Sequence, residues 1–180
     1  MNLPNKLTVL RVLMIPFFVL FALVDAVPGY SRYIAVLIFI LASLTDLLDG
    51  KIARKYNLVT NFGKFMDPLA DKLLVCAALI CLVSQGLLPA WMVIVIISRE
   101  FIISGFRLVA SDNGVVIAAS YWGKFKTTFQ MLMIIFLLLD FGGAFLWISQ
   151  AVTWIALILT VVSLLDYVIK NKHVILEGNI

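Results

Sequence analysis

Six apolar runs of about 20 residues follow one another along the chain, and they restrict its possible folds more than any other feature. A helix of about this length crosses the hydrocarbon core of a bilayer. The runs lie near residues 7–25, 31–50, 65–85, 88–108, 124–140 and 145–168. They leave little length for a separate soluble domain, and 63% of the residues are hydrophobic against 13% charged. The sequence therefore predicts an all-α integral membrane protein with six transmembrane helices and one membrane domain over residues 1–180.

The first run could also be interpreted as a secretory signal peptide, because Lys6 and Arg11 precede an apolar stretch over residues 12–23. Pro16 interrupts that stretch, and five further runs follow it. We therefore expect the first run to be retained as a membrane helix.

Lysine and arginine residues gather in alternate connections between the runs. One set comprises the amino terminus, the second and fourth connections and the tail, with Lys6, Arg11, Lys51, Arg54, Lys55, Lys64, Arg107, Lys124, Lys126, Lys170 and Lys172. The opposite connections have Arg32. Because cytoplasmic loops are enriched in these residues, both termini and the second connection are predicted on the cytoplasmic side of the cell membrane. The net charge of +4 then reflects topology and does not indicate nucleic-acid binding.

Four aspartates stand close together around the second connection. Asp46 and Asp49 are three residues apart, and Asp67 and Asp71 are four apart, so each pair shares a helix face. Carboxylates beside a membrane need cations to neutralise them. Each aspartate alone could cap a helix or pair with a lysine. Two helix ends that each present two carboxylates favour a site for a hard divalent cation, Mg²⁺ or Mn²⁺.

Small residues and one arginine accompany the aspartates. Gly50, Ala53 and Gly63 remove side-chain bulk where a large ligand would approach the backbone, and Arg54 supplies a planar donor suited to phosphate. Carboxylates, a divalent metal and a phosphate-facing arginine together indicate phosphoryl-group chemistry.

The complete pattern is Asp46-x2-Asp49-Gly50-x2-Ala53-Arg54-x8-Gly63-x3-Asp67-x3-Asp71, and it resembles the signature of the CDP-alcohol phosphotransferase family with no position missing. The resemblance implies six membrane helices, a site that faces the cytoplasm, two metal ions bound by the four aspartates, and a homodimer. It also implies that Asp71 is the general base. The residues that it places around the CDP moiety are Asp49, Gly50, Ala53, Arg54, Gly63 and Asp67.

Outside the signature, residues 3–11, 98–107 and 123–127 resemble the branch of the family whose acceptor alcohol is sn-glycerol 3-phosphate. Arg99 and Arg107 are eight residues apart on one helix face, and Lys124 and Lys126 enter the membrane on the same predicted side. Such cations suit the phosphate of the acceptor. Positive-inside anchoring is the alternative for the two lysines, and a buried ion pair with Glu100 is the alternative for Arg99.

The start of the first helix contributes weaker candidates. Thr8 and Arg11, three residues apart on one face, are candidates for the acceptor phosphate, with capping and lipid anchoring as their alternatives. Asn5 could cap the same helix.

The expected reaction is transfer of the phosphatidyl group from CDP-diacylglycerol to sn-glycerol 3-phosphate, which yields phosphatidylglycerophosphate and CMP. Other acceptors are possible within the family: inositol phosphate, serine or phosphatidylglycerol. A prenyl-diphosphate synthase also uses aspartate pairs and Mg²⁺, but its soluble helical fold does not fit this composition. A six-helix transporter with an aspartate ion site is the alternative from another class, although its site would lie near mid-membrane.

Overall fold

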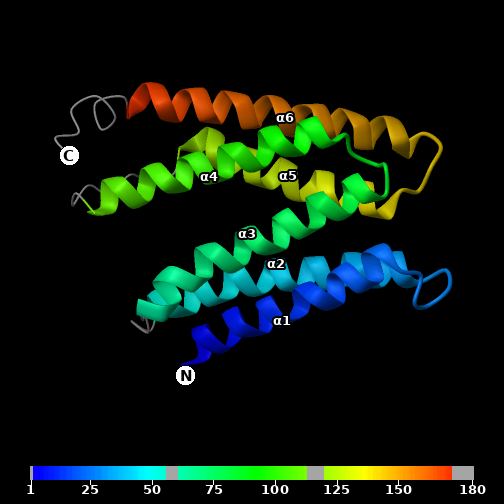
Figure 1. The fold of residues 1–180 in the computed structure, drawn as a ribbon, viewed down its shortest axis with the longest axis horizontal. Helices are drawn as coiled ribbons and strands as arrows, with labels where there is room; N and C mark the ends of the chain where they lie inside the picture. Colours follow the sequence, from blue (N-terminus) through cyan, green and yellow to red (C-terminus); the bar gives the residue numbers. More distant parts are fainter. Residues whose placement is uncertain (1, 56–60, 113–119, 172–180) are drawn as a thin grey trace. The chain divides into compact units, whose positions relative to one another are not determined.

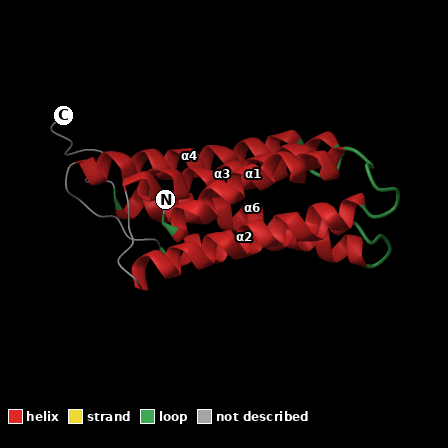
Figure 2. Cartoon of the chain, turned by 90° about the horizontal axis from the view of Figure 1, so that it is seen from below, coloured by secondary structure: helices red, strands yellow, loops and turns green. Residues whose placement is uncertain are grey.

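A computed structural model describes the backbone of residues 2–55, 61–112 and 120–171, and leaves the side chains of residues 3–4, 47–55, 61–65, 67–68 and 111–112 outside the description. The described parts of the chain form helices and no strands (Figure 2). The helices are α1 (Leu3–Leu23), α2 (Ser31–Lys55), α3 (Asn61–Ser84), α4 (Ala90–Asp112), α5 (Tyr121–Leu139) and α6 (Phe145–Lys170). Each of the six predicted runs coincides with one of these helices, so the all-α prediction is confirmed.

Two helix starts have a side-chain cap. The Asn2 side-chain oxygen accepts a hydrogen bond from the Asn5 backbone N–H at 3.2 Å, with Pro4 in the first turn of α1. Asn2, and not Asn5, therefore caps α1. Capping by Asn5, which the sequence allowed, does not occur because Asn5 already lies inside the helix, one turn after the cap. Ser120 caps α5 in the same way, by accepting from the Gly123 N–H at 3.2 Å.

The chain divides into two compact units, residues 1–88 and 89–180. In unit 1, α1 packs against α2 and α3, and α2 also contacts α3 (Figure 1). The face of α2 toward α1 has buried residues at helical spacing, Ala35, Phe39 and Ala42. The rings of Phe18 and Phe39 lie 5.8 Å apart between these two helices. Unit 1 is thus an antiparallel three-helix arrangement with an apolar core.

In unit 2, α6 packs against α4 and α5. Its buried face consists mostly of small residues spaced alternately four and three apart, Ser149, Thr153, Ala156, Thr160, Ser163 and Tyr167. Small side chains let helix backbones approach closely and form van der Waals contacts. Inside a membrane these contacts drive helix association, because the hydrophobic effect does not act between helices there. The hydroxyl of Thr160 donates to the Ala156 carbonyl at 2.7 Å, so this polar atom is satisfied by its own helix.

Three helices of the described residues are long and apolar enough to cross a membrane: Asn5–Leu23, Tyr121–Leu139 and Phe145–Lys170. Their outward faces carry large apolar side chains, such as Phe17 and Ile158, which are 59% and 57% exposed. In α2, α3 and α4, charged residues interrupt the apolar runs, including Asp46, Asp71 and Arg99. These three residues are among the predicted site residues, and the others on α1 and α5 include Arg11 and Lys126.

Candidate functional site

The signature residues lie on two neighbouring helices of unit 1. Asp46 belongs to α2 and Asp71 to α3, and the two helices run antiparallel with the end of α2 beside the start of α3 (Figure 1). Asp46 lies nine residues before the last residue of α2, Lys55, and Asp71 lies ten residues after the first residue of α3, Asn61. The two carboxylates therefore occupy similar heights along the pair of helices.

The other signature residues are placed by their backbone alone. Asp49, Gly50, Ala53 and Arg54 belong to α2, and Gly63 and Asp67 belong to α3, but their side chains lie outside the described residues. Among the side chains that the structure does describe, no three metal-ligating groups gather at one point. The predicted convergence of four aspartates and their contacts with CDP thus remain predictions.

Asp46 has a described partner, and it is an arginine of the neighbouring helix. Arg11 Nη1 lies 3.0 Å from Asp46 Oδ1, and Arg11 Nε donates to the Ala42 carbonyl oxygen at 3.3 Å. The Arg11 side chain is 0% exposed, whereas that of Asp46 is 32% exposed. Thr8, one turn before Arg11 on α1, is buried as well. The structure therefore brings a predicted acceptor ligand, Arg11, into contact with a predicted metal ligand.

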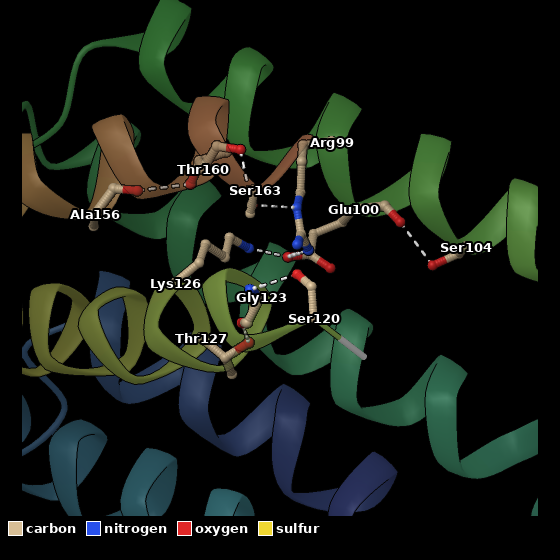
Figure 3. A network of polar contacts seen from close by, with 10 residues as sticks. All are labelled: Arg99, Glu100, Ser104, Ser120, Gly123, Lys126, Thr127, Ala156, Thr160 and Ser163. Carbon is tan, nitrogen blue, oxygen red and sulfur yellow. Dashed lines mark hydrogen bonds and ion pairs between the residues drawn. The ribbon is translucent and has the colours of Figure 1, made fainter. Parts of the chain in front are cut away.

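A second charged cluster lies inside unit 2, where α4, α5 and α6 meet (Figure 3). Lys126 Nζ of α5 donates to Glu100 Oε1 of α4, and Arg99 Nη1 approaches the same oxygen at 3.4 Å. Arg99 Nε also donates to Ser163 Oγ of α6 at 3.1 Å. Arg99 is 8% exposed and Lys126 is 1% exposed. Two predicted acceptor ligands are thus held together, and the predicted ion pair between Arg99 and Glu100 is confirmed.

The start of α5 lies against the guanidinium of Arg99. A Cβ atom built on Gly123 would come within 3.4 Å of Arg99 Nη2, and within 3.6 Å of Ser120 Oγ. Glycine therefore lets the arginine approach the first turn of α5 closely. The first-turn N–H groups of a helix carry partial positive charge, so this end of α5 adds to the cationic character of the cluster.

The other two predicted cations are exposed and contact aromatic rings. The Arg107 guanidinium carbon lies 5.9 Å from the centre of the Tyr167 ring, and Lys124 Nζ lies 5.3 Å from that of Tyr121. Tyr167 is buried in unit 2, so Arg107 lies at the edge of its core. Arg99 and Lys126 consequently form the inner part of the predicted acceptor site, and Arg107 and Lys124 lie on the surface of the same unit.

Ser163 is a hydrogen-bond partner of Arg99 that the sequence did not reveal. A serine within an apolar helix is common, because its hydroxyl can bond to the preceding turn, as Ser163 does to Thr160 at 3.0 Å. Its role emerges only when α4 and α6 pack together. The sequence did indicate that Glu100 has a partner, because an acidic residue within an apolar run needs one.

Comparison with known proteins agrees with these observations. The model of the family described as CDP-alcohol phosphatidyltransferase matches residues 1–162. This chain therefore belongs to the CDP-alcohol phosphatidyltransferase family, and the resemblance carried by the aspartate signature is confirmed. Family membership removes the support for a transporter and for a prenyl-diphosphate synthase.

Particular relatives share most of the chain. A Bacillus subtilis protein named "CDP-diacylglycerol--glycerol-3-phosphate 3-phosphatidyltransferase" is 46% identical, with 99% of each chain covered. A Haemophilus influenzae protein of the same name is 40% identical, with 98% of this chain and 97% of the relative covered. A Mycobacterium tuberculosis protein named "Probable phosphatidylglycerophosphate synthase" is 41% identical over 94% of this chain and 81% of its own length.

Proposed function

We propose that this chain transfers the phosphatidyl group of CDP-diacylglycerol to sn-glycerol 3-phosphate, and so produces phosphatidylglycerophosphate and CMP for phospholipid biosynthesis. Relatives named for this reaction cover the chain almost end to end at 38–46% identity. The structural observation that carries the choice of acceptor is the buried cluster of Arg99, Lys126 and Glu100. Two cations share one carboxylate oxygen there, so the trio has a net charge of +1. A buried positive charge attracts a phosphate-bearing substrate.

The donor set of the signature suits a hard divalent metal. Asp46 and Asp71 provide carboxylate oxygens on adjacent antiparallel helices, and both side chains remain partly accessible. We place two Mg²⁺ or Mn²⁺ ions on Asp46, Asp49, Asp67 and Asp71. When bound, these ions would neutralise charge on the pyrophosphate of the donor. The CDP moiety would contact Asp49, Gly50, Ala53, Arg54, Gly63 and Asp67.

Asp71 is proposed as the general base. Its carboxylate would accept the proton of the primary hydroxyl of glycerol 3-phosphate. The oxygen of that hydroxyl then forms a bond to the β-phosphorus of CDP-diacylglycerol, and the bond from this phosphorus to the oxygen of CMP breaks. When the hydroxyl and the phosphorus are held in line, the reaction becomes effectively unimolecular, and its activation barrier is lower. The proton leaves Asp71 for solvent after the product departs.

The acceptor phosphate would bind at the cation cluster of unit 2. The Arg99 guanidinium can give parallel hydrogen bonds to two phosphate oxygens, whereas the Lys126 ammonium acts as a point charge. Arg107 and Lys124 would complete the site from the surface. The sequence also predicts Thr8 and Arg11 for this phosphate. We keep Thr8 as a ligand of the acceptor phosphate. We do not keep Arg11 in that role, because it contacts Asp46.

The two units would together form one membrane domain over residues 1–180. We propose that all six helices cross the cell membrane, with both termini and the active site on the cytoplasmic side, and that the protein is a homodimer. Three apolar helices support a membrane location. The excess of lysine and arginine in alternate connections supports the orientation.

The test is release of CMP by the purified protein in detergent. CDP-diacylglycerol and Mg²⁺ would be supplied with sn-glycerol 3-phosphate, with inositol phosphate, with serine, with phosphatidylglycerol, or with no acceptor. We expect release with glycerol 3-phosphate alone, and none after addition of a chelator. Release with a different alcohol would keep the family reaction but contradict the acceptor assignment. Absence of release with every acceptor would contradict the proposed function as a whole.

A further inference from the structure

We propose that Arg11 is a positioning residue for the Asp46 carboxylate, and that it acts on metal binding and not on the acceptor phosphate. The proposal rests on the proposed function, because Asp46 matters here as a ligand of the divalent metal. Arg11 was singled out by the sequence as an acceptor ligand or a lipid anchor. The described contacts of its guanidinium instead join α1 to α2.

The first argument is the two-point attachment of the guanidinium to α2. Nη1 lies 3.0 Å from Asp46 Oδ1, and Nε donates to the Ala42 carbonyl at 3.3 Å. Ala42 and Asp46 are four residues apart, so they lie one helical turn from each other on the same face. Arg11 thus bridges from the backbone of one turn to the side chain of the next. This arrangement restricts the rotamer of Asp46 relative to its own helix.

The second argument is that rigid packing places Arg11 opposite Asp46. The rings of Phe18 and Phe39 lie 5.8 Å apart, and both side chains are 0% exposed. Seven residues from this contact in each helix, two turns further along the antiparallel pair, Arg11 meets Asp46. Ala42 lies between Phe39 and Asp46 on α2, and its methyl group leaves room for the long arginine side chain. The register of α1 against α2 therefore presents the guanidinium to this aspartate.

The third argument is burial. An arginine that anchors the protein to lipid must reach the headgroups, yet the side chain of Arg11 is 0% exposed. Arg11 and Asp46 form a pair with no net charge, and the guanidinium is 0% exposed, so this pair offers a phosphate neither an excess positive charge nor an accessible N–H group. Breaking a buried ion pair is strongly unfavourable, because it leaves a charge without compensation. The geometry thus favours a permanent partnership with Asp46.

The chemistry of a carboxylate allows both partners. Two oxygens provide about four lone-pair directions, so a salt bridge through Oδ1 is compatible with metal ligation by the same group. Groups that orient a metal ligand in this way commonly contribute 10-fold to 100-fold to metal affinity. Asp46 is 32% exposed, and Arg11 lies on its buried side. Arg11 would thus hold the ligand in one orientation from the side away from solvent.

The decisive experiment measures Mn²⁺ affinity of the full-length protein in detergent, from the electron paramagnetic resonance signal of free Mn²⁺. We expect Arg11→Met to weaken binding by about 10-fold to 100-fold. Arg11→Lys should give an intermediate loss, because an ammonium cannot bridge both acceptors as the guanidinium does. Arg32→Met is the matched control: this arginine is exposed at the other end of unit 1, and its removal should leave the Mn²⁺ Kd unchanged.

Steady-state kinetics separate this role from direct acceptor binding. A positioning role predicts a higher Mg²⁺ requirement for Arg11→Lys, with little change in KM for glycerol 3-phosphate. A higher KM for glycerol 3-phosphate at unchanged Mn²⁺ affinity would overturn the proposal and restore the acceptor role. If Arg11→Met does not fold, Arg11→Lys decides alone: a Mn²⁺ Kd equal to that of the wild type would overturn the proposal.

A thermal-unfolding cycle without metal tests whether Arg11 acts through Asp46. The variants are Arg11→Met, Asp46→Asn and the double variant. We expect the double variant to have a Tm no lower than that of Arg11→Met, whereas additive losses would overturn the proposal. Failure of the wild type to bind Mn²⁺ would contradict the proposed metal site itself. Tight binding by both the wild type and Arg11→Met would contradict only the role of Arg11.

Discussion

Lys126 of α5 and Glu100 of α4 form an ion pair whose lysine side chain is 1% exposed and whose glutamate side chain is 21% exposed (Figure 3). The same glutamate oxygen is approached by Arg99, and Arg99 in turn donates to Ser163 of α6. The carboxylate therefore joins α4 to α5, and Arg99 links the same cluster to α6. The carboxylate also keeps two predicted phosphate ligands side by side.

Removal of the lysine from this pair should destabilise unit 2. Lys126→Met leaves Arg99 as a remaining partner of Glu100, which is 21% exposed. The loss should therefore be smaller than the cost of about 3–5 kcal/mol for removal of one partner from a fully buried pair. The matched control is Lys170→Met, since Lys170 is 65% exposed in its pair with Asp166. That exposed pair should contribute about 0–1 kcal/mol. Thermal unfolding of both variants in the same detergent measures the difference, and equal Tm values would contradict the structural role of Lys126.

The planar guanidinium of Arg99, and not its positive charge alone, should determine the affinity for glycerol 3-phosphate. Arg99→Lys keeps a positive charge but loses the hydrogen bond to Ser163 and the capacity for paired bonds to phosphate. We expect KM for glycerol 3-phosphate to rise about tenfold, which corresponds to about 1.4 kcal/mol, while KM for CDP-diacylglycerol stays unchanged. Arg32→Lys, at an exposed position of unit 1, should change neither constant. An increase in KM for the donor instead would place Arg99 at the other substrate.

The asparagine variants of Asp71 and Asp67 should lose different properties of the enzyme, turnover in the first and Mn²⁺ affinity in the second. Asp71→Asn removes the proposed base and should lower kcat by about 10²-fold to 10⁴-fold, while Mn²⁺ affinity falls less than it does in Asp67→Asn. Turnover and Mn²⁺ binding would be measured on the same preparations. An equal loss of Mn²⁺ affinity in the two variants would show that Asp71 has no separate role as base.

The glycine at the start of α5 should be sensitive to a methyl group. A Cβ on Gly123 would lie 3.4 Å from Arg99 Nη2, whereas a Cβ on Gly105 of α4 would meet nothing within 4 Å. Gly105→Ala should stabilise the protein by about 0.5–1 kcal/mol through helix propensity. Gly123→Ala should gain less, because its methyl group would touch the end of the Arg99 side chain, and KM for glycerol 3-phosphate should rise only slightly. Thermal unfolding and acceptor kinetics check both, and identical behaviour of the two variants would contradict the close contact with Arg99.

The sequence predicted the helices well and their ends less well. All six apolar runs are helices, but the helix over the run at residues 31–50 continues to Lys55. The helix over the run that starts near residue 124 begins earlier, at Tyr121. An apolar run reports the thickness of the membrane and not the length of the helix. The ends depend on local hydrogen bonds instead, such as the cap that Ser120 provides for α5.

The sequence by itself determined the all-helical class, the family, and the identity of the charged residues at issue, because apolar run length and fixed motif spacing are local properties of the chain. Only the tertiary structure decided which charges meet. Arg11 and Asp46 are 35 residues apart, and Lys126 and Glu100 are 26 residues apart. Their pairing depends on the register of packed helices, which Phe18 and Phe39 set in unit 1 and the small residues of α6 set in unit 2. Local periodicity carries no information about that register, so the partner of a buried charge had to come from the packed helices.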